Sequence, residues 1–222
     1  PRVQGLQPAA ASRRFPSYLA PAMTQLPELP LTLSRQEIRK MIRQRRRALT
    51  PEQQQEMGQQ AATRMMTYPP VVMAHTVAVF LSFDGELDTQ PLIEQLWRAG
   101  KRVYLPVLHP FSAGNLLFLN YHPQSELVMN RLKIHEPKLD VRDVLPLSRL
   151  DVLITPLVAF DEYGQRLGMG GGFYDRTLQN WQQYGLQPVG YAHDCQGVEA
   201  LPVEKWDVPL SAVVTPSKIW VW

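Results

Sequence analysis

The sequence of 222 residues predicts an α/β protein in three layers: an open, mainly parallel sheet with helices on both of its faces. Two observations predict this fold class. Short apolar runs rich in Val, Ile and Leu alternate with amphipathic segments after Pro70, and such alternation is typical of parallel sheets whose strands are joined by helices. Apolar residues also make up 45% of the chain, which is enough for the core of one domain of this size.

The segments before the sheet are expected to form two helices. Residues 34–37, Ser-Arg-Gln-Glu, have the pattern of a capping box, so order should begin there. The apolar residues that follow fall near one helical face, and we expect the arginines of residues 35–47 to occupy the other faces. A second helix should begin with Pro51 at its first position and run to about Met66.

The strand–helix alternation begins with an apolar, β-branched strand at 76–82, a helix at 89–102 and a strand at 103–108. This is a βαβ unit, for which a right-handed crossover is expected. A further helix should run from about Tyr174 to Tyr184. Further strands are expected at 116–121, 151–156, 189–193 and 212–216.

The beginning of the chain differs from the rest in composition. Residues 1–33 contain six prolines and show no sustained periodicity, so we expect a flexible lead there, with Met23 as a candidate natural start. Residues 34–222 are expected to form a single α/β domain.

Composition also excludes some classes of protein. No uncharged apolar run approaches the roughly 18 residues needed to cross a bilayer, so no membrane partner is expected. The single cysteine, Cys195, excludes an internal disulfide and favours a reducing, cytoplasmic location. We expect a monomer.

The formal net charge of +3 conceals an asymmetry along the chain. Residues 1–47 carry ten Lys or Arg against two acids, whereas the remaining 175 residues carry thirteen against eighteen. A nucleic-acid-binding protein usually spreads its basic surface over the folded body, and this body is mildly acidic. Nucleic acid is therefore not the expected partner, and the basic segment needs another explanation.

The segment GMGGGFYDR, residues 168–176, places four glycines within five positions beyond a predicted strand. Open sheets of this kind bind ligands beyond the carboxyl ends of their strands. The segment matches neither the P-loop, which ends in Gly-Lys-Ser/Thr, nor the dinucleotide fingerprint Gly-x-Gly-x-x-Gly. Consecutive glycine N–H groups at the start of a helix still form a concave site for phosphate, and Asp175 is suited to hold Mg²⁺ beside a polyphosphate.

These residues resemble the 5-formyltetrahydrofolate cyclo-ligase family, in a bacterial form, over about Ser34 to Thr215. The most specific match is RLGMGGGFYDR, residues 166–176, which resembles the glycine loop of the family. Three further segments resemble family segments: FLSFDGELDT (80–89), LPVEKWDVPL (201–210) and RQEIR (35–39).

The resemblance implies an enzyme that couples ATP hydrolysis to the cyclisation of 5-formyltetrahydrofolate, with Mg²⁺ as cofactor. The products would be 5,10-methenyltetrahydrofolate, ADP and phosphate. In such a reaction the formyl oxygen attacks the γ-phosphate, N10 closes the ring and phosphate leaves. The protein would supply mainly positioning and charge stabilisation.

The resemblance also implies roles for individual residues. ATP would be bound by Arg35, Arg39, Arg166, Leu167, Gly168, Met169, Gly170, Gly171, Gly172, Phe173 and Tyr174. The folate would contact Leu81, Glu86, Met169, Gly170, Gly171, Gly172 and Phe173. Glu86 would accept hydrogen bonds from pterin N–H groups, and Asp175 with Asp207 would hold Mg²⁺. Because Arg35 and Arg39 are four residues apart on one helical face, they would explain the basic segment as half of a nucleotide site.

The sequence departs from the family pattern at two places. Arg35 stands where the family has lysine, and arginine is bulkier and forked. Met169 and Gly171 stand at positions where the family often has a basic residue, so less positive charge would face the phosphates.

Two other functions fit part of the pattern. A sugar-phosphate isomerase on a similar sheet would use the glycine loop for a monophosphate and would take Glu86 as its base. An RNA-binding protein would act through the Arg-rich helix, and its affinity would fall steeply with salt. Removal of residues 34–49 would distinguish these hypotheses. It would abolish ATP binding in the ligase and RNA binding in the RNA-binding protein, and it would leave phosphate binding by an isomerase largely intact.

Overall fold

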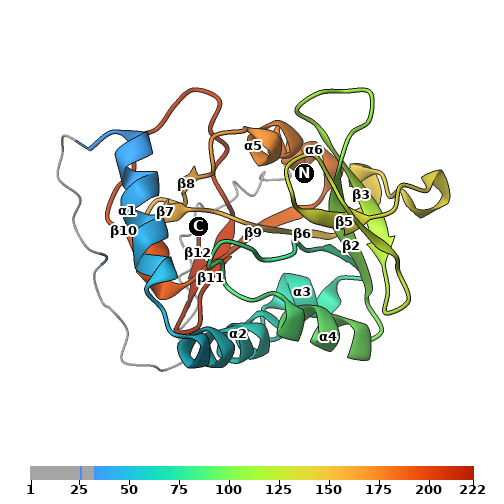
Figure 1. The fold of residues 1–222 in the computed structure, drawn as a ribbon, viewed down its shortest axis with the longest axis horizontal. Coiled ribbons are helices and arrows are strands. Elements are labelled where there is room, and N and C mark those ends of the chain that lie inside the picture. Colours follow the sequence, from blue (N-terminus) through green and yellow to red (C-terminus); the bar gives the residue numbers. More distant parts are fainter. Residues whose placement is uncertain (1–25, 27–32) are drawn as a thin grey trace, which may run out of the picture.

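The computed structural model describes Leu26 and residues 33–222 (Figure 1). The expected flexible lead at residues 1–33, including Met23, lies outside the described residues apart from Leu26 and Leu33. Within the described part of the chain, no helix is long and apolar enough to cross a membrane.

A sheet of seven strands lies at the centre of the described residues. Its spatial order is β12 (Ile219–Val221), β11 (Ala212–Val214), β9 (Gln187–Tyr191), β6 (Val152–Thr155), β1 (Thr76–Ala78), β2 (Arg102–Leu108) and β3 (Leu116–Tyr121). The five inner strands run parallel to one another, and only the two edge strands, β12 and β3, pair antiparallel with their neighbours. The prediction of an open, mainly parallel sheet is confirmed.

Helices cover both faces of this sheet, as expected for three layers (Figure 1). One face packs against α2 (Pro51–Met65), α3 (Pro69–Met73) and α4 (Gln90–Arg98). The other face packs against α5 (Phe173–Leu178) and α6 (Trp181–Tyr184). Successive strand residues alternate between the two cores: Val77 contributes to the first and Ala78 to the second.

The helix α1 (Arg35–Arg47) packs away from the main sheet. Its Ile38 and Ile42 are buried against a small sheet in the order β10 (Gly197–Val198), β7 (Ala159–Asp161) and β8 (Arg166–Leu167). The expected capping box is present, since the Ser34 hydroxyl accepts from the Glu37 N–H at 3.1 Å and Glu37 accepts from the Ser34 N–H at 3.2 Å.

The remaining short elements complete the framework. A hairpin of β4 (Leu127–Met129) and β5 (His135–Pro137) follows β3. Three single turns of 3₁₀ helix are η1 (Val141–Asp143), η2 (Leu147–Arg149) and η3 (Asp194–Gln196).

Two predictions about helices were wrong. The helix expected from Tyr174 to Tyr184 is broken into α5 and α6, because Asn180 adopts a left-handed conformation with φ +58°. Not all arginines of α1 lie on its polar faces either. Arg46 follows Ile38 and Ile42 at helical spacing, and it is buried with an exposed fraction of 1%.

Candidate active site

The site lies where the order of the sheet reverses. β1 pairs with β2 on one side and with β6 on the other. The chain therefore continues from β1 towards one edge of the sheet through β2 and β3, and later towards the other edge through β6 and β9. Phe80 and Leu81 follow the carboxyl end of β1, and Pro156 and Leu157 follow that of β6. All four line a cavity of about 990 Å³. The cavity lies at the carboxyl ends of the strands, where ligands bind in open α/β sheets.

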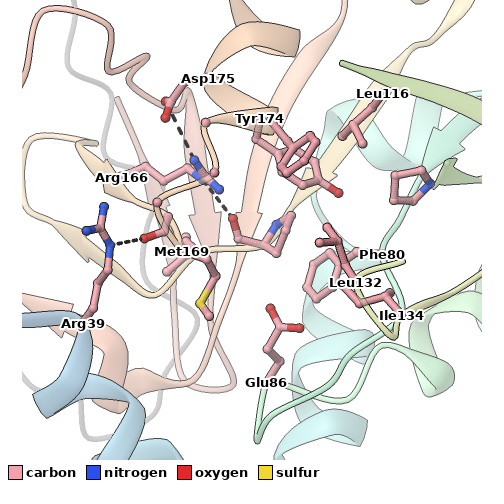
Figure 2. A pocket seen from close by; sticks show the side chains of 18 of the residues that line it. Arg39, Phe80, Glu86, Leu116, Leu132, Ile134, Arg166, Met169, Tyr174 and Asp175 are labelled. Atoms are coloured by element: carbon pink, nitrogen blue, oxygen red, sulfur yellow. Dashed lines mark hydrogen bonds and ion pairs between the residues drawn. The ribbon is translucent and has the colours of Figure 1, made fainter. Parts of the chain in front are cut away.

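The lining of this cavity has two chemically different halves (Figure 2). The apolar half includes Phe80, Leu105, Leu108, Leu116, Leu132 and Ile134. The polar half contains Arg35, Arg39, Arg166, Asp175 and the glycines of residues 168–172. In the view of Figure 2, Glu86 and Met169 lie between the labelled arginines and the labelled apolar side chains. The cavity can therefore hold a ligand with one charged end and one flat, apolar end.

The glycine loop requires its glycines for conformation and for space. Gly170 and Gly172 have φ values of +106° and +70°, in which L side chains are strained, and Gly172 is the N-cap of α5. A Cβ atom added to Gly168 would lie 3.0 Å from the guanidinium of Arg166. The loop backbone thus lies directly against the cationic groups of the cavity.

Arg39 bonds this loop directly, whereas Arg166 bonds the residue that follows β6. Arg39 Nε donates to the carbonyl of Gly168 at 2.7 Å, and Arg166 Nε donates to the carbonyl of Pro156 at 2.8 Å. Arg166 is only 6% exposed, and its guanidinium lies 3.8 Å from Asp175 and 5.4 Å above the ring of Tyr174. Burial lowers the pKa of Arg166 while Asp175 raises it, and a guanidinium remains charged near neutral pH.

The two acids expected to hold Mg²⁺, Asp175 and Asp207, are linked through neighbouring groups. Arg35 donates to both oxygens of Asp207, at 2.6 and 3.0 Å. The N–H of Val208, the next residue, donates to Asp175 Oδ1 at 3.3 Å. Within the described residues no group of three or more His, Cys, Asp or Glu could hold a metal ion. A cation held by Asp175 and Asp207 would need further oxygen ligands, such as those of a bound phosphate.

Glu86 lies beside the apolar half of the cavity (Figure 2). Burial raises its pKa to about 7, although the N–H of Phe83 donates to Glu86 Oε1 at 3.1 Å and Arg46 acts to lower the pKa. Its carboxyl group is therefore close to half protonated near neutral pH, and a ligand that donates hydrogen bonds to it would favour the charged form.

Comparison with known proteins matches residues 32–216 to the 5-formyltetrahydrofolate cyclo-ligase family. The chain belongs to this family. It is 94% identical over 182 residues to the 5-formyltetrahydrofolate cyclo-ligase of Escherichia coli K12, which covers 82% of this chain and 100% of that protein. It is 54% identical to the cyclo-ligase of Haemophilus influenzae, over 81% of this chain and 96% of the relative.

Solved structures of related proteins have the same fold. The NMR structure of 5,10-methenyltetrahydrofolate synthetase from Aquifex aeolicus is 26% identical, with a TM-score of 0.74 over 85% of this chain and 93% of the other. A synthetase from Mycoplasma pneumoniae is 21% identical, with a TM-score of 0.65 over 83% and 99% of the two chains, and supports the fold alone.

For this cyclo-ligase family member, the structure brings most of the sequence-predicted site residues to one cavity. The lining includes Arg35, Arg39, Leu81, Glu86, Arg166, Gly168, Met169, Gly170, Gly171, Gly172, Phe173, Tyr174 and Asp175. Leu167 is fully buried in the core beneath α1, so only its backbone could serve a nucleotide. Asp207 does not line the cavity, because its carboxylate is paired with Arg35.

Sequence reasoning missed most of the apolar half of this cyclo-ligase cavity. Leu132 and Ile134 come from the turn between β4 and β5, and Leu105 and Leu116 come from β2 and β3. The only signal in the sequence is the alternation of Leu132 and Ile134 with charged residues. Such a pattern indicates a half-buried strand and carries no information about a ligand.

Proposed function

We propose that this chain catalyses the ATP-dependent cyclisation of 5-formyltetrahydrofolate to 5,10-methenyltetrahydrofolate, with release of ADP and phosphate. The observation that carries the proposal is a single cavity in which a cationic, glycine-lined half meets an apolar half, in a chain of the cyclo-ligase family. This arrangement suits a reaction between a polyphosphate and a flat heterocycle.

The polar half is the proposed ATP site. Arg35, Arg39 and Arg166 supply positive charge, and N–H groups of the loop at 168–172 would face the phosphates. Leu167 would contribute through its backbone, and Tyr174 lies beside Arg166 at the edge of this half. The contacts of Arg39 and Arg166 to backbone carbonyls support this assignment, since they fix both guanidinium groups beside the loop.

The apolar half is the proposed folate site. Leu81, Met169 and Phe173 would contact the ring system, and Glu86 would accept hydrogen bonds from pterin N–H groups. Burial of an ionised carboxylate away from water is favourable only when the ligand donates hydrogen bonds to it. The raised pKa of Glu86 in the free protein supports this role, because the ionised form is stabilised when the donor arrives.

The proposed chemistry needs the two substrates to meet at the glycine loop. The formyl oxygen attacks the γ-phosphate of ATP and releases ADP. N10 then attacks the activated formyl carbon, and the phosphate leaves as the ring closes. Residues 169–173 all line this cavity, and they would contact both substrates and hold the formyl oxygen against the phosphate. The arginines would stabilise negative charge on the transferred group.

We propose that Asp175 and Asp207 hold Mg²⁺ together with phosphate oxygens. Asp175 fits this role directly, because it lines the cavity and carboxylate oxygen is a preferred ligand of Mg²⁺. Asp207 fits it once Arg35 turns from the carboxylate to the phosphates. When bound, the ion would neutralise charge on the β- and γ-phosphates.

The two other functions have less support. The RNA-binding hypothesis requires free arginines on α1, whereas Arg43, Arg46 and Arg47 all contact Asp84. The isomerase hypothesis uses only one phosphate and leaves Arg35 and Arg39 without a purpose. We further propose that residues 34–222 act as one domain, as a cytoplasmic monomer without a membrane or nucleic-acid partner.

The experiment that tests the proposal mixes the protein with 5-formyltetrahydrofolate, ATP and Mg²⁺ and follows the absorbance of the methenyl product. We expect a rise that requires ATP. Asp175→Asn should lower kcat by about 10²–10³, the usual effect of removing one charge-stabilising group. Asp140→Asn is the matched control, because Asp140 pairs with Arg142 outside the cavity lining. A folded wild-type protein that gives no rise would exclude the proposed reaction.

A further inference from the structure

A tight turn, residues 83–86, carries Glu86 into the cavity and is bound to α1 by three arginines. Arg43 Nε donates to Asp84 Oδ2 at 2.9 Å, and Arg47 Nε donates to Asp84 Oδ1 at 2.6 Å. The buried Arg46 donates from Nη2 to Asp84 Oδ2 at 3.3 Å and from Nε to the Asp84 carbonyl at 2.9 Å. One carboxylate thus contacts three arginines in the last two turns of the helix. We call this group the Asp84 cluster.

The backbone of the turn is also held by hydrogen bonds, in addition to those of the Asp84 side chain. Asp84 and Gly85 have φ values of +54° and +75°, which give the chain a sharp reversal. The Gly85 carbonyl accepts from Gln54 Nε2 at 3.1 Å and lies 3.1 Å from His193 Nε2. Burial lowers the pKa of His193 to about 4, so the ring is neutral and Nε2 carries the proton that it donates to this carbonyl. The turn is held from α1, α2 and η3 together.

The consequence of this turn is the position of one carboxyl group. Glu86 Oε1 accepts from the N–H of Phe83 inside the turn, and Figure 2 shows the carboxyl group directed into the cavity. Burial disfavours the charged form of Glu86, and Arg46 partly offsets this effect. Because the same arginine binds the backbone of Asp84, the location and the charge of Glu86 both depend on the Asp84 cluster.

We propose that Asp84 and the three arginines are positioning residues for the folate substrate. They attach the turn to α1, and so fix the carboxyl group of Glu86 relative to Arg35 and Arg39 at the beginning of the same helix. Arg39 and Arg46 are seven residues apart, which is about 10 Å along a helix axis. This inference rests on the proposed function, because it takes Glu86 as a folate contact and Arg39 as an ATP contact.

The helix therefore acts as a rigid spacer between the two halves of the cavity. Its first turn faces the glycine loop through Arg39, and its last two turns hold the folate-facing turn. In the formyl transfer proposed above, a less firmly held Glu86 weakens a contact that the bound folate and the transition state share, so the effect falls on KM rather than on kcat. Because one helix contacts both halves of the cavity, it fixes the distance between them. The middle of the helix does not need to contact either substrate.

The first test measures the turn without any substrate. Asp84→Asn keeps the size of the side chain and tolerates a left-handed backbone, but it removes the charge that gathers the arginines. Hydrogen exchange at the Glu86 N–H, which donates to the Phe83 carbonyl at 3.0 Å, should become at least about tenfold faster if the turn opens more easily. Asp140→Asn removes another Asp–Arg pair and should leave this exchange unchanged.

The second test measures the consequence for the folate. In Asp84→Asn, the KM for 5-formyltetrahydrofolate should rise about tenfold, within the usual range of coupling between sites, while kcat and the ATP affinity stay within twofold of the wild type. A merely structural role would lower the fraction of active enzyme, and thus kcat, at an unchanged KM. An unchanged KM in folded Asp84→Asn would overturn the proposal, and so would an equal change in Asp140→Asn.

A milder variant keeps the proposal testable if Asp84→Asn does not fold. Arg43 is 34% exposed, so Arg43→Gln should fold while it removes one of the contacts, and KM for the folate should rise about threefold. A KM equal to that of the wild type would again overturn the proposal. Failure of the proposed function has a different signature: the wild-type protein would form no methenyl product, yet the exchange at Glu86 would still respond to Asp84→Asn.

Discussion

Two carboxylates contact arginines of α1, and they differ in how firmly they are held. Asp207 contacts a single arginine, Arg35, through two hydrogen bonds, and it also accepts from the N–H of Glu204 at 2.9 Å. Asp84 contacts three arginines, one of them fully buried. Arg35 could exchange Asp207 for another anion of the same geometry, such as a phosphate. The Asp84 cluster has no such freedom, because removal of Asp84 would leave three cationic groups without the one acid that all of them contact.

The difference suggests that one helix serves two purposes. At its beginning, the charge of Arg35 is balanced by a single acid, and its guanidinium can bind a ligand anion in place of that acid. At its end, the positive charges exceed the negative charge of Asp84 and stabilise a turn that has left-handed backbone at Asp84 and Gly85. The following predictions test whether the end of the helix is structural and its beginning exchangeable.

The largest effect is expected at the buried arginine. Arg46→Met should lower the free energy of unfolding by about 2–4 kcal/mol, because it removes the contacts to Asp84 and leaves a buried polar carbonyl without its donor. Arg47→Ala, at a side chain that is 51% exposed, should cost less than about 1 kcal/mol. Urea unfolding followed by circular dichroism measures both values. Equal losses in the two variants would contradict a structural role for burial of Arg46.

Sequence reasoning selected the residues of one of these two groups, although not their pairing, and none of the other group. Arg35, Arg39 and Asp207 were predicted because they lie in segments that resemble the family. The arginines at 43–47 have the pattern of a solvated helical face, and their partner lies 37 to 41 residues further along the chain. Only the packing of α1 against the turn reveals that Arg46 is buried, and no local pattern encodes that packing.

For the fold as well, local sequence patterns predicted the elements better than the contacts between distant segments. Six of the seven strands of the main sheet were predicted from local apolar runs, which is typical of strands buried between two layers of helices. The edge strand β12 was not predicted, because its three residues are only partly buried and form no such run. The break between α5 and α6 was missed because Asn180 lies in a segment of otherwise helical character, and one left-handed residue is enough to end a helix. The apolar wall of the cavity was missed because the topology of the sheet brings β2 and β3 beside the glycine loop.

A smaller effect is expected in the pH dependence of folate binding. The pKa of Glu86 is raised to about 7 by burial, and the proposed contact needs the ionised form. The affinity for 5-formyltetrahydrofolate should therefore increase about tenfold from pH 6 to pH 8, as expected for one proton released on binding. Titration calorimetry at the two pH values measures it, and Glu86→Gln should abolish the dependence.

The same group gives a stability prediction of definite sign. The folded-state pKa of Glu86 lies above its ordinary value, so its contribution to stability is present below about pH 4.5 and is lost as the pH rises through about 7. The free energy of unfolding of Glu86→Gln should therefore fall less than that of the wild type over this interval. A wild-type protein whose stability rose more steeply than that of Glu86→Gln would show that Glu86 is not buried as described.

The smallest effect is expected at the pair of Arg35 and Asp207. The change in the affinity for ATP caused by Asp207→Asn should have opposite signs without and with Mg²⁺. Without Mg²⁺, Asp207→Asn frees Arg35 for the phosphates, so the affinity for ATP should rise about three- to fivefold, which corresponds to about 1 kcal/mol. With Mg²⁺, the same variant lacks a proposed ligand of the ion, and the affinity should fall.

Asp84→Asn is the matched control for this prediction, because it also removes an acid that contacts α1 but lies at the other end of the helix. Its affinity for ATP should stay within about twofold of the wild type with and without Mg²⁺, the range expected of a distant site. If Asp207→Asn changes the affinity in the same direction under both conditions, Asp207 does not serve first as a partner of Arg35 and then as a ligand of the metal. The two ends of α1 would then be alike, and Arg35 would be held by its acid as firmly as Arg46 is held by Asp84.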